Sequence, residues 1–373
     1  MKKKVLFILH FPPPVHGSAV MGLQVKESKL IAASYDCRHV NLGTSITIDE
    51  IGRNYLGKII RYLTILCNVV VNLLRRRPDL CYLAITSKGP AFYKDAVVVA
   101  LVKLFRVKLI YHFHNKGVGD RQDKPLDDGL YRYVFKNTDA ILLSKHLYSD
   151  VKKYIPSRRV YYCPNGIPDI VGSNIKKKSR EVNATINVLF LSNLLKAKGV
   201  YVLLAACKIL QGQQLDFHCT FVGGIGDVSA QQFLFEVQKL NLENYVDYVG
   251  AKFGDEKGLE FERADIFAFP TLNECFPLVL LEAMQHSLPI IATCEGGIPD
   301  IIEDGVSGFL VEKNDSLALA NKLAMLIQNK NLREDMGKNG RFRYDKSFTS
   351  QHFETKLHEI LGQCGGVPSS LGG

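Results

Sequence analysis

One stretch, residues 267–293, constrains the fold of this chain more than any other. It reads FAFPTLNECFPLVLLEAMQHSLPIIAT. A short apolar run ends at Pro270, a polar loop contains Glu274, a helical pattern begins at Pro277, and a second apolar run follows Pro289. A strand, a loop, a helix and another strand in this order predict a parallel sheet covered by helices, so the predicted fold class is α/β.

The predicted start of this helix suits an anion. A proline at the first helical position leaves neighbouring N–H groups pointing into the loop, where the helix dipole adds positive potential. Glu274 and Glu282 can accept hydrogen bonds from hydroxyl groups on either side of a phosphate, as in a sugar nucleotide. The alternative is an ordinary surface helix with an acidic residue near its N-terminus. The spacing alone does not decide, because Glu295 and Glu303 share it.

Length and composition predict a globular protein of two domains. The chain has 373 residues, more than one core usually fills, with 47% hydrophobic and 23% charged residues. Its most apolar run, residues 59–74, is interrupted by Arg61, Asn68 and Asn72, so we expect a soluble or peripheral protein. Nine cysteines without metal-like spacing favour a reducing cytoplasm and argue against zinc.

Positive charge is concentrated in the first half. Residues 1–165 contain 27 Lys+Arg and 12 Asp+Glu, whereas the remainder contains 20 and 25. No aromatic-rich RNA motif or zinc finger accompanies this charge, so we expect no nucleic acid. An anionic membrane surface or a phosphate-bearing acceptor is the preferred partner, and a plain solvated surface is the alternative.

The first half alternates strands and helices. Apolar patterns predict strands at residues 5–9, 37–41, 80–85, 108–113, 140–143 and 160–162, and helices at 20–33, 55–76 and 91–105. Open parallel sheets bind ligands at the carboxyl ends of their strands. Gly17 follows the first strand and His114 ends the fourth, so both are candidate site residues. A lone histidine is more often structural than functional. His112, two residues before His114, is the alternative candidate.

The second half starts the same pattern again. A strand at residues 186–191, the loop SNLLKAKG and a helix at 200–209 predict a second Rossmann-like domain. Between the halves, residues 169–184 include three consecutive lysines and no apolar period, which indicates a linker.

The central stretch also carries a family resemblance. Glu274-Cys275-Phe276-Pro277, followed by Glu282-Ala283-Met284, resembles the motif of retaining GT-B glycosyltransferases of family 4, the glycosyl transferases group 1, of bacterial surface-polysaccharide type. The resemblance covers nearly the whole chain. It implies a GT-B fold, in which two Rossmann-like domains face a central cleft and the C-terminal helix crosses back to the N-terminal domain.

The resemblance implies roles for the residues of the central helix. We hypothesise that Glu282 holds the ribose hydroxyls, because it lies deeper in the helix, and that Glu274 meets the transferred sugar. Phe276, Pro277 and Leu278, at the turn into the helix, are assigned to donor binding.

The other site residues come from the resemblance to loops elsewhere in the chain. Gly17 is expected near the donor phosphates, and the ring of His114 is expected to face the transferred sugar. Lys198 matches a lysine that holds the diphosphate, whereas Asn193 stands where an arginine is usual. Either Lys196 substitutes, or phosphate binding depends more on Lys198 and the helix terminus.

We expect neither a metal nor a cofactor. No Asp-x-Asp pair occurs, so the ligands of metal-dependent glycosyltransferases are missing. Lys198 and helix-terminal amides are expected to stabilise charge on the leaving diphosphate. Retention implies attack on the face that the leaving group departs from, with a leaving phosphate oxygen as proton acceptor.

These observations lead to one domain scheme. An acceptor-side domain spans residues 1–168 with a returning helix at 346–362, a linker spans 169–184, a nucleotide-sugar-binding domain spans 185–345, and a disordered tail spans 365–373.

The predicted activity is hexosyl transfer from a nucleoside-diphosphate sugar to a hydroxyl of a glycan acceptor. The acceptor is taken to be polyprenyl-diphosphate-linked, in bacterial O-antigen, capsule or exopolysaccharide synthesis. The protein is placed in the cytoplasm, peripheral at the inner membrane face. The alternatives are a sugar-nucleotide epimerase of the same architecture and a non-catalytic basic protein that binds membranes or nucleic acid.

Overall fold

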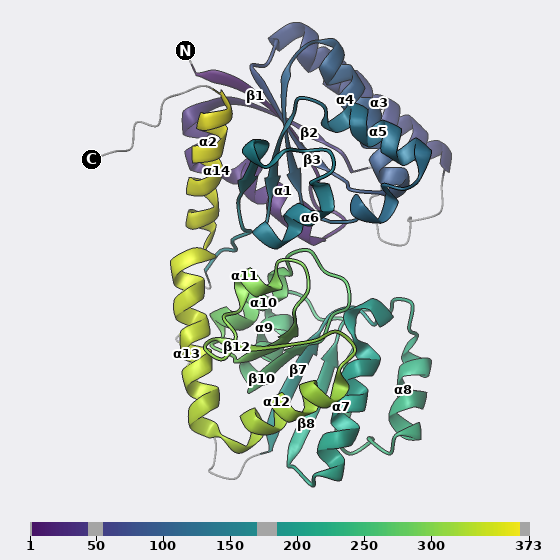
Figure 1. Ribbon diagram of the computed structural model, residues 1–373, viewed down its shortest axis with the longest axis vertical. Coiled ribbons are helices and arrows are strands. Elements are labelled where there is room, and N and C mark those ends of the chain that lie inside the picture. The colour runs from purple at the N-terminus through teal and green to yellow at the C-terminus, as the bar shows by residue number, and fades with distance from the viewer. Residues whose placement is uncertain (1, 44–54, 170–184, 366–373) are drawn as a thin grey trace, which may run out of the picture. The chain divides into compact units, whose positions relative to one another are not determined.

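The chain divides into two compact units in the computed structural model, which describes residues 2–43, 55–169 and 185–365 (Figure 1). Unit 1 comprises Met1–Asn165 and Ser350–Gly373, and unit 2 comprises Gly166–Thr349. The predicted linker and tail, apart from Asp169 and Gly365, lie outside the described residues.

Unit 1 is built on a six-stranded parallel sheet of order β2-β1-β3-β4-β5-β6. The strands are β1 (Lys3–Leu9), β2 (Tyr35–Asn41), β3 (Leu80–Ile85), β4 (Lys108–Phe113), β5 (Asp139–Leu142) and β6 (Val160–Tyr162). Helices on both faces exclude water from a parallel sheet, so its central strands are nearly continuous apolar runs. Every residue of β3 is buried.

Helices cover both faces of this sheet. They are α1 (Gly17–Glu27), α2 (Lys29–Ser34), α3 (Tyr55–Arg76), α4 (Gly89–Leu104), α5 (Pro125–Phe135), α6 (Tyr148–Val151) and α14 (Ser350–Gly365). On one face, α3, α4 and α5 bury a core that includes Val69 and Phe92. On the other face, Phe353 of α14 stacks on His112 with ring centroids 6.4 Å apart. The C-terminal helix therefore completes the core of unit 1.

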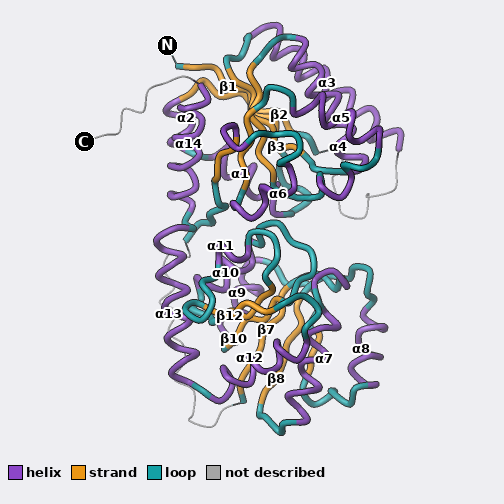
Figure 2. The backbone as a smooth tube through the Cα atoms, viewed as in Figure 1, coloured by secondary structure: helices purple, strands orange, loops and turns teal. Residues whose placement is uncertain are grey.

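Unit 2 is built on a second six-stranded parallel sheet, of order β12-β11-β10-β7-β8-β9. The strands are β7 (Ile186–Leu191), β8 (Phe217–Val222), β9 (Val246–Tyr248), β10 (Ile266–Phe269), β11 (Ile290–Thr293) and β12 (Gly308–Val311). The helices are α7 (Val200–Gly212), α8 (Ala230–Lys239), α9 (Gly254–Arg263), α10 (Leu278–Gln285), α11 (Ile298–Ile301), α12 (Ser316–Gln328) and α13 (Lys330–Ser347). Figure 2 shows the strands of each unit between its helices.

The prediction of two Rossmann-like α/β domains is confirmed. Read from the β9 edge, unit 2 has the strand order 3-2-1-4-5-6 of dinucleotide-binding folds. The predicted helix at 20–33 is wrong as a single helix: Ser28 ends α1, and its hydroxyl caps α2 by accepting the Ile31 N–H at 3.2 Å. The predicted start of α10 is wrong by one residue, because Pro277 has an extended ψ of 118° and precedes the helix.

Candidate active site

The loops after β7 and β10 meet in unit 2, where the strand order changes direction. The Leu272 N–H donates to the Ala197 carbonyl at 2.8 Å, and Thr271 Oγ1 donates to the same oxygen at 3.2 Å. Open α/β sheets bind ligands outside the carboxyl ends of their strands at such a switch point. These two loops carry Lys198 and Glu274.

Lys198 and Glu274 form an ion pair at this switch point. The Lys198 ammonium donates to Glu274 Oε2, and the side chains are 21% and 17% exposed. The Lys198 Nζ also lies 5.7 Å from the centre of the Phe269 ring, within cation–π range. Both side chains are partly shielded from water, which strengthens their electrostatic interactions, and both keep some access to a ligand. A cation and a hydrogen-bond acceptor therefore stand side by side where a ligand is expected.

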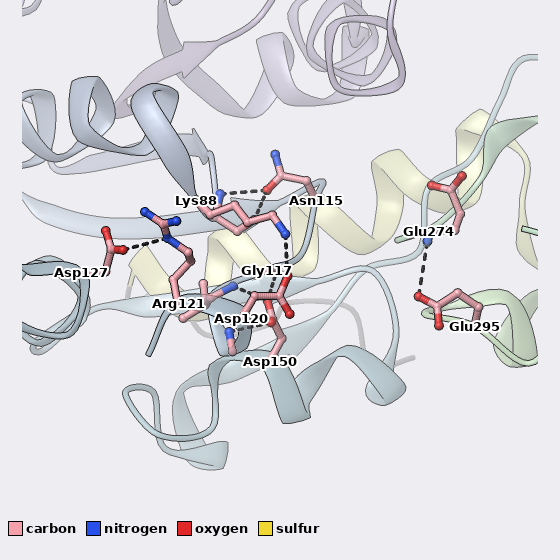
Figure 3. Close-up of polar contacts among 12 residues, drawn as sticks. Lys88, Asn115, Gly117, Asp120, Arg121, Asp127, Asp150, Glu274 and Glu295 are labelled. Carbon is pink, nitrogen blue, oxygen red and sulfur yellow. Dashed lines mark hydrogen bonds and ion pairs between the residues drawn. The ribbon is translucent and has the colours of Figure 1, made fainter. Parts of the chain in front are cut away.

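Glu295 holds the backbone of Glu274, as Figure 3 shows. The Glu274 N–H donates to Glu295 Oε1 at 3.3 Å. Glu295 is only 5% exposed, and Lys313 balances its charge at 2.8 Å. Sequence reasoning missed Glu295 as a site residue, although its position just after the buried strand β11 is a usable signal.

Gly296 allows the loop after β11 to approach the Glu274 loop closely. Its φ of +56° is in the left-handed region, and a Cβ there would collide with the carbonyl oxygen of Glu274. The next residue, Gly297, donates its N–H to the Cys275 carbonyl at 2.7 Å. A residue with a side chain cannot occupy position 296 unless the Glu274 loop shifts.

The predicted donor-binding residues Phe276, Pro277 and Leu278 lie at the start of α10. Phe276 is 5% exposed and its ring packs 6.1 Å from that of Phe348, so only its backbone can face a ligand. Helix starts leave backbone N–H groups without helical partners, and these groups attract anions.

Glu282 lies inside α10 and forms a separate ion pair. Its carboxylate accepts a hydrogen bond from Lys257 of α9 at 2.6 Å, and the two side chains are 29% and 28% exposed. Lys257 was not predicted, because it lies 25 residues away on a different helix and no local pattern marks it.

The arginine position of the resembled family is occupied by Asn193, which takes a structural role. Its Oδ1 accepts the N–H of Gly224 at 3.0 Å and thereby ties the loop after β7 to the loop after β8. Lys196 lines a surface hollow with Tyr201 and Gln232. Thus Lys198, and not Lys196, is paired with Glu274.

In unit 1, His112 and His114 have different surroundings. His112 is fully buried, its Nδ1 is hydrogen-bonded to the Tyr82 hydroxyl, and its ring stacks on Phe353. His114 follows the carboxyl end of β4 and is partly exposed, and its buried Nδ1 has no hydrogen-bond partner among the described residues. His112 is therefore a core residue, and His114 is the one that can meet a ligand.

Two more histidines lie near His114. Burial, followed by repulsion from His10 and His16, lowers the pKa of His114 to about 3. The pKa of His10 is lowered to about 4, chiefly by burial. His16 caps α1 by accepting the Ala19 N–H at 3.3 Å, and Gly17 is the exposed first residue of that helix. At neutral pH the ring of His114 is therefore uncharged.

The loop after His114 is fixed by Asp150, a residue that sequence reasoning missed (Figure 3). Its carboxylate accepts the N–H groups of Gly117, Val118 and Gly119 at 2.9, 3.1 and 2.8 Å. Asn115, next to His114, accepts hydrogen bonds from the backbone and hydroxyl of Ser87 at 2.8 and 2.6 Å. These contacts hold the strand end that carries His114.

The described side chains suggest an anion site without an evident metal site. Within residues 2–43, 55–169 and 185–365, no three His, Cys, Asp or Glu residues are grouped so that they could hold a metal ion. The expectation that catalysis needs no metal stays a prediction. Unit 2 places a cation, Lys198, and the start of α10 near the carboxylate of Glu274, and the carboxylate of Glu282 lies inside α10.

Comparison with solved structures identifies the class of fold. HepE of Anabaena, crystallised in complex with UDP, is 20% identical, covers 96% of this chain and 100% of its own, and superposes with a TM-score of 0.73. The chain thus has the GT-B fold of two Rossmann-like units.

Sequence comparison then shows which family the second unit resembles. Residues 172–343 match the family model of glycosyl transferases group 1, and this range belongs to unit 2. The capsular polysaccharide biosynthesis glycosyltransferase CapM of Staphylococcus aureus is 29% identical over 50% of this chain and 48% of its own length. The amylovoran biosynthesis glycosyltransferase AmsK of Erwinia amylovora is 29% identical over 61% and 57%. The matches span only about half the length of these relatives, and the class of enzyme that they support is a glycosyltransferase.

Proposed function

We propose that the chain is a retaining glycosyltransferase of family 4. It moves a hexose-type sugar from a nucleoside-diphosphate sugar to a hydroxyl group of a glycan acceptor in bacterial polysaccharide biosynthesis. The observation that carries this proposal is the ion pair between Lys198 and Glu274, beside the start of α10 at the switch point of unit 2. The names of CapM and AmsK, both of polysaccharide biosynthesis, support the substrate class.

The donor is proposed to bind between Lys198 and Glu274 and to replace their ion pair with its own contacts to each side chain. Its diphosphate binds the Lys198 ammonium and the backbone N–H groups at the start of α10, while Glu274 accepts a hydrogen bond from the sugar. Glu282, which is paired with Lys257, accepts hydrogen bonds from the ribose. The UDP bound by HepE supports a nucleoside diphosphate as the ligand class.

The proposed transfer step breaks the bond between the anomeric carbon and the diphosphate oxygen. The acceptor hydroxyl oxygen forms the new bond to that carbon on the same face, and its proton passes to a leaving phosphate oxygen. Lys198 and the α10 N–H groups stabilise the negative charge that develops on the diphosphate. His114 is proposed to form a hydrogen bond with the transferred sugar, and burial lowers the pKa of its ring to about 3.

A lysine substitution with a matched control tests this proposal. Removing one charge-stabilising donor typically lowers kcat by about 10² to 10³-fold, so Lys198→Ala should lower kcat/KM by at least about 100-fold. Lys239→Ala removes a lysine whose ion pair to Glu236, at 3.3 Å, lies on the surface of α8, and it should leave kcat/KM unchanged. Equal activity of the two variants would overturn the role of Lys198.

The products distinguish the three candidate activities. A transferase releases free nucleoside diphosphate only when an acceptor is present. An epimerase converts the sugar while it stays attached to the nucleotide, and a binding protein changes neither substrate. A thermal-shift screen of nucleotide sugars supplies the donor for these assays, because each bound donor raises the unfolding temperature.

We further propose a lipid-diphosphate-linked acceptor and a peripheral location at the cytoplasmic membrane face. The excess of 27 Lys+Arg over 12 Asp+Glu in residues 1–165 supports this, because basic residues near anionic lipid gain about 1 kcal/mol each. Activity on an extracted lipid-linked glycan, compared with the same glycan freed from its lipid, tests the acceptor class.

A further inference from the structure

Helix α3 of unit 1 has an apolar face that is exposed in the part of the chain that the structure describes. Six of its apolar side chains are 42% to 77% exposed: Leu56, Ile59, Ile60, Leu63, Val71 and Leu74. We call these six residues the outer face of α3. The opposite side of the helix packs on the sheet through Ile65, Val69 and Leu73, which are at most 6% exposed. The helix is therefore apolar on two sides, and only one side is used in the core.

The outer face forms one continuous stripe. Its residues recur at intervals of three, four and seven to eight positions, which at about 100° per residue confines them to an arc of about 120°. From Leu56 to Leu74 the stripe is about 27 Å long at 1.5 Å per residue. Figure 1 shows α3 among the helices on the outside of unit 1, and its neighbours in contact include α4 and β2.

The charges around the outer face favour an anionic partner. Helix α3 contains Lys58, Arg61, Arg75 and Arg76 and no acidic residue. Arg76 pairs with Asp36 at 3.6 Å. At about 100° per residue, Arg75 lies about 40° from the edge of the stripe. Unit 1 as a whole contains 28 Lys+Arg and 14 Asp+Glu. Two copies of so basic a surface would repel each other, whereas an anionic bilayer attracts it.

The packing of α3 restricts how it can meet a bilayer. By length and composition alone the helix could cross a membrane. Crossing would require Ile65, Val69 and Leu73 to leave the core of unit 1, in which they are buried, and would open that core. A helix that packs one face on the protein and exposes a second apolar face is suited to lying parallel to the membrane, at the boundary between lipid and water.

We propose that the outer face of α3 inserts into the surface of an anionic bilayer. The apolar side chains enter the boundary between headgroups and acyl chains, and the flanking Arg75 side chain binds lipid phosphates. This inference rests on the proposed function, in which the acceptor is linked to a lipid, and it assigns the surface that brings unit 1 to that acceptor.

Co-sedimentation with vesicles tests the proposal. Wild-type protein should bind vesicles of phosphatidylglycerol and phosphatidylcholine more strongly than phosphatidylcholine alone, and added salt should weaken the binding. The variant Ile59→Gln/Leu63→Gln should bind the anionic vesicles at least about tenfold more weakly, because two inserted apolar side chains are lost. Since both residues are 54% exposed, the variant should keep the unfolding temperature of the wild type.

A matched variant in unit 2 serves as control. Leu234 of α8 and Leu317 of α12 are 53% and 58% exposed, so Leu234→Gln/Leu317→Gln removes equally exposed apolar groups. It should bind vesicles like the wild type. Equal vesicle binding by both double variants would overturn the proposal. A loss of dimer in sedimentation velocity, with vesicle binding unchanged, would overturn it in favour of a second copy of the chain.

Enzyme assays separate this inference from the proposed function. The outer-face variant should release nucleoside diphosphate at the wild-type rate with a water-soluble acceptor and more slowly with an acceptor embedded in anionic vesicles. Full activity together with unchanged vesicle binding sinks only the docking surface. Specific vesicle binding without any acceptor-dependent release sinks only the proposed transferase activity.

Discussion

Substituting Gly296 by alanine should damage the candidate site through the backbone of a neighbouring loop. An alanine at this position is destabilised in two ways. The φ of +56° is unfavourable for a residue with a Cβ, and the Cβ would overlap the carbonyl oxygen of Glu274. Gly305 provides a matched control. Its φ is +76°, but a Cβ there meets nothing within 4 Å. The pair of variants therefore separates the conformational penalty from the collision.

The structure gives the size of each effect. A left-handed conformation costs a residue with a Cβ roughly 1 to 2 kcal/mol, so Gly305→Ala should lose about that much stability. Gly296→Ala adds an overpacking term of about 1 to 3 kcal/mol and should lose about 2 to 5 kcal/mol. The collision is relieved by movement of the Glu274 loop, and a shift of about 1 Å at a reacting group can reduce the rate about 100-fold.

Urea denaturation and steady-state kinetics measure the two consequences. Far-UV circular dichroism suits the first measurement, because the chain contains no tryptophan. Gly305→Ala should retain the wild-type kcat/KM, whereas Gly296→Ala should fall by one to two orders of magnitude. Equal losses of stability in the two variants, with turnover intact in both, would refute the argument that position 296 holds the Glu274 loop.

Glu282→Ala should weaken nucleoside-diphosphate binding by roughly 1.5 to 3 kcal/mol in calorimetry, and unchanged affinity would contradict the ribose assignment. His114→Ala should lower turnover far more than nucleotide affinity, whereas His112→Ala should chiefly lower the unfolding temperature; the reverse pattern would mean that the wrong ring was chosen. Asp150→Asn, which weakens three hydrogen bonds to the loop after His114, should lower kcat with little change in donor Kd and be rescued in part by Asp150→Glu; an unchanged kcat would rule out a positioning role. The free energy of unfolding should fall as pH drops below about 6.5, because the pKa values of His10 and His114 are lowered in the folded protein and the unfolded chain therefore binds more protons. Each histidine contributes up to about 1.4 kcal/mol per pH unit. An unchanged slope of unfolding free energy against pH in His10→Gln/His114→Gln would exclude these two residues as the source.

Sequence patterns predicted the residues that lie at strand ends. Lys198 and Glu274 each follow a buried apolar run, and the carboxyl ends of parallel strands lie at the same edge of a sheet. The sequence alone therefore makes it reasonable to expect these two residues close together, and they form an ion pair. His114 was distinguished from His112 by the same rule. The prediction that these residues act on a donor stays a prediction.

The residues that sequence reasoning missed act through tertiary contacts. Lys257 reaches Glu282 from another helix, and Asp150 reaches the loop at 117–119 from more than 30 residues away. No local periodicity encodes such pairs. The apolar pattern of α3 was likewise ambiguous, because an apolar residue at a helical position does not reveal whether it packs in the protein core or faces lipid.

The division of unit 1 between the two ends of the chain has a consequence for its biosynthesis. Helix α14 supplies Phe353 to the core beside His112, yet Gly166–Thr349 must be translated first. At about 5 to 20 residues per second, the ribosome needs on the order of 10 to 40 seconds for that interval. During this time the nascent first unit exposes the apolar surface that α14 later covers. A holdase chaperone should therefore engage this nascent chain until α14 has been synthesised, and a stop codon before Ser350 should yield a protein that aggregates.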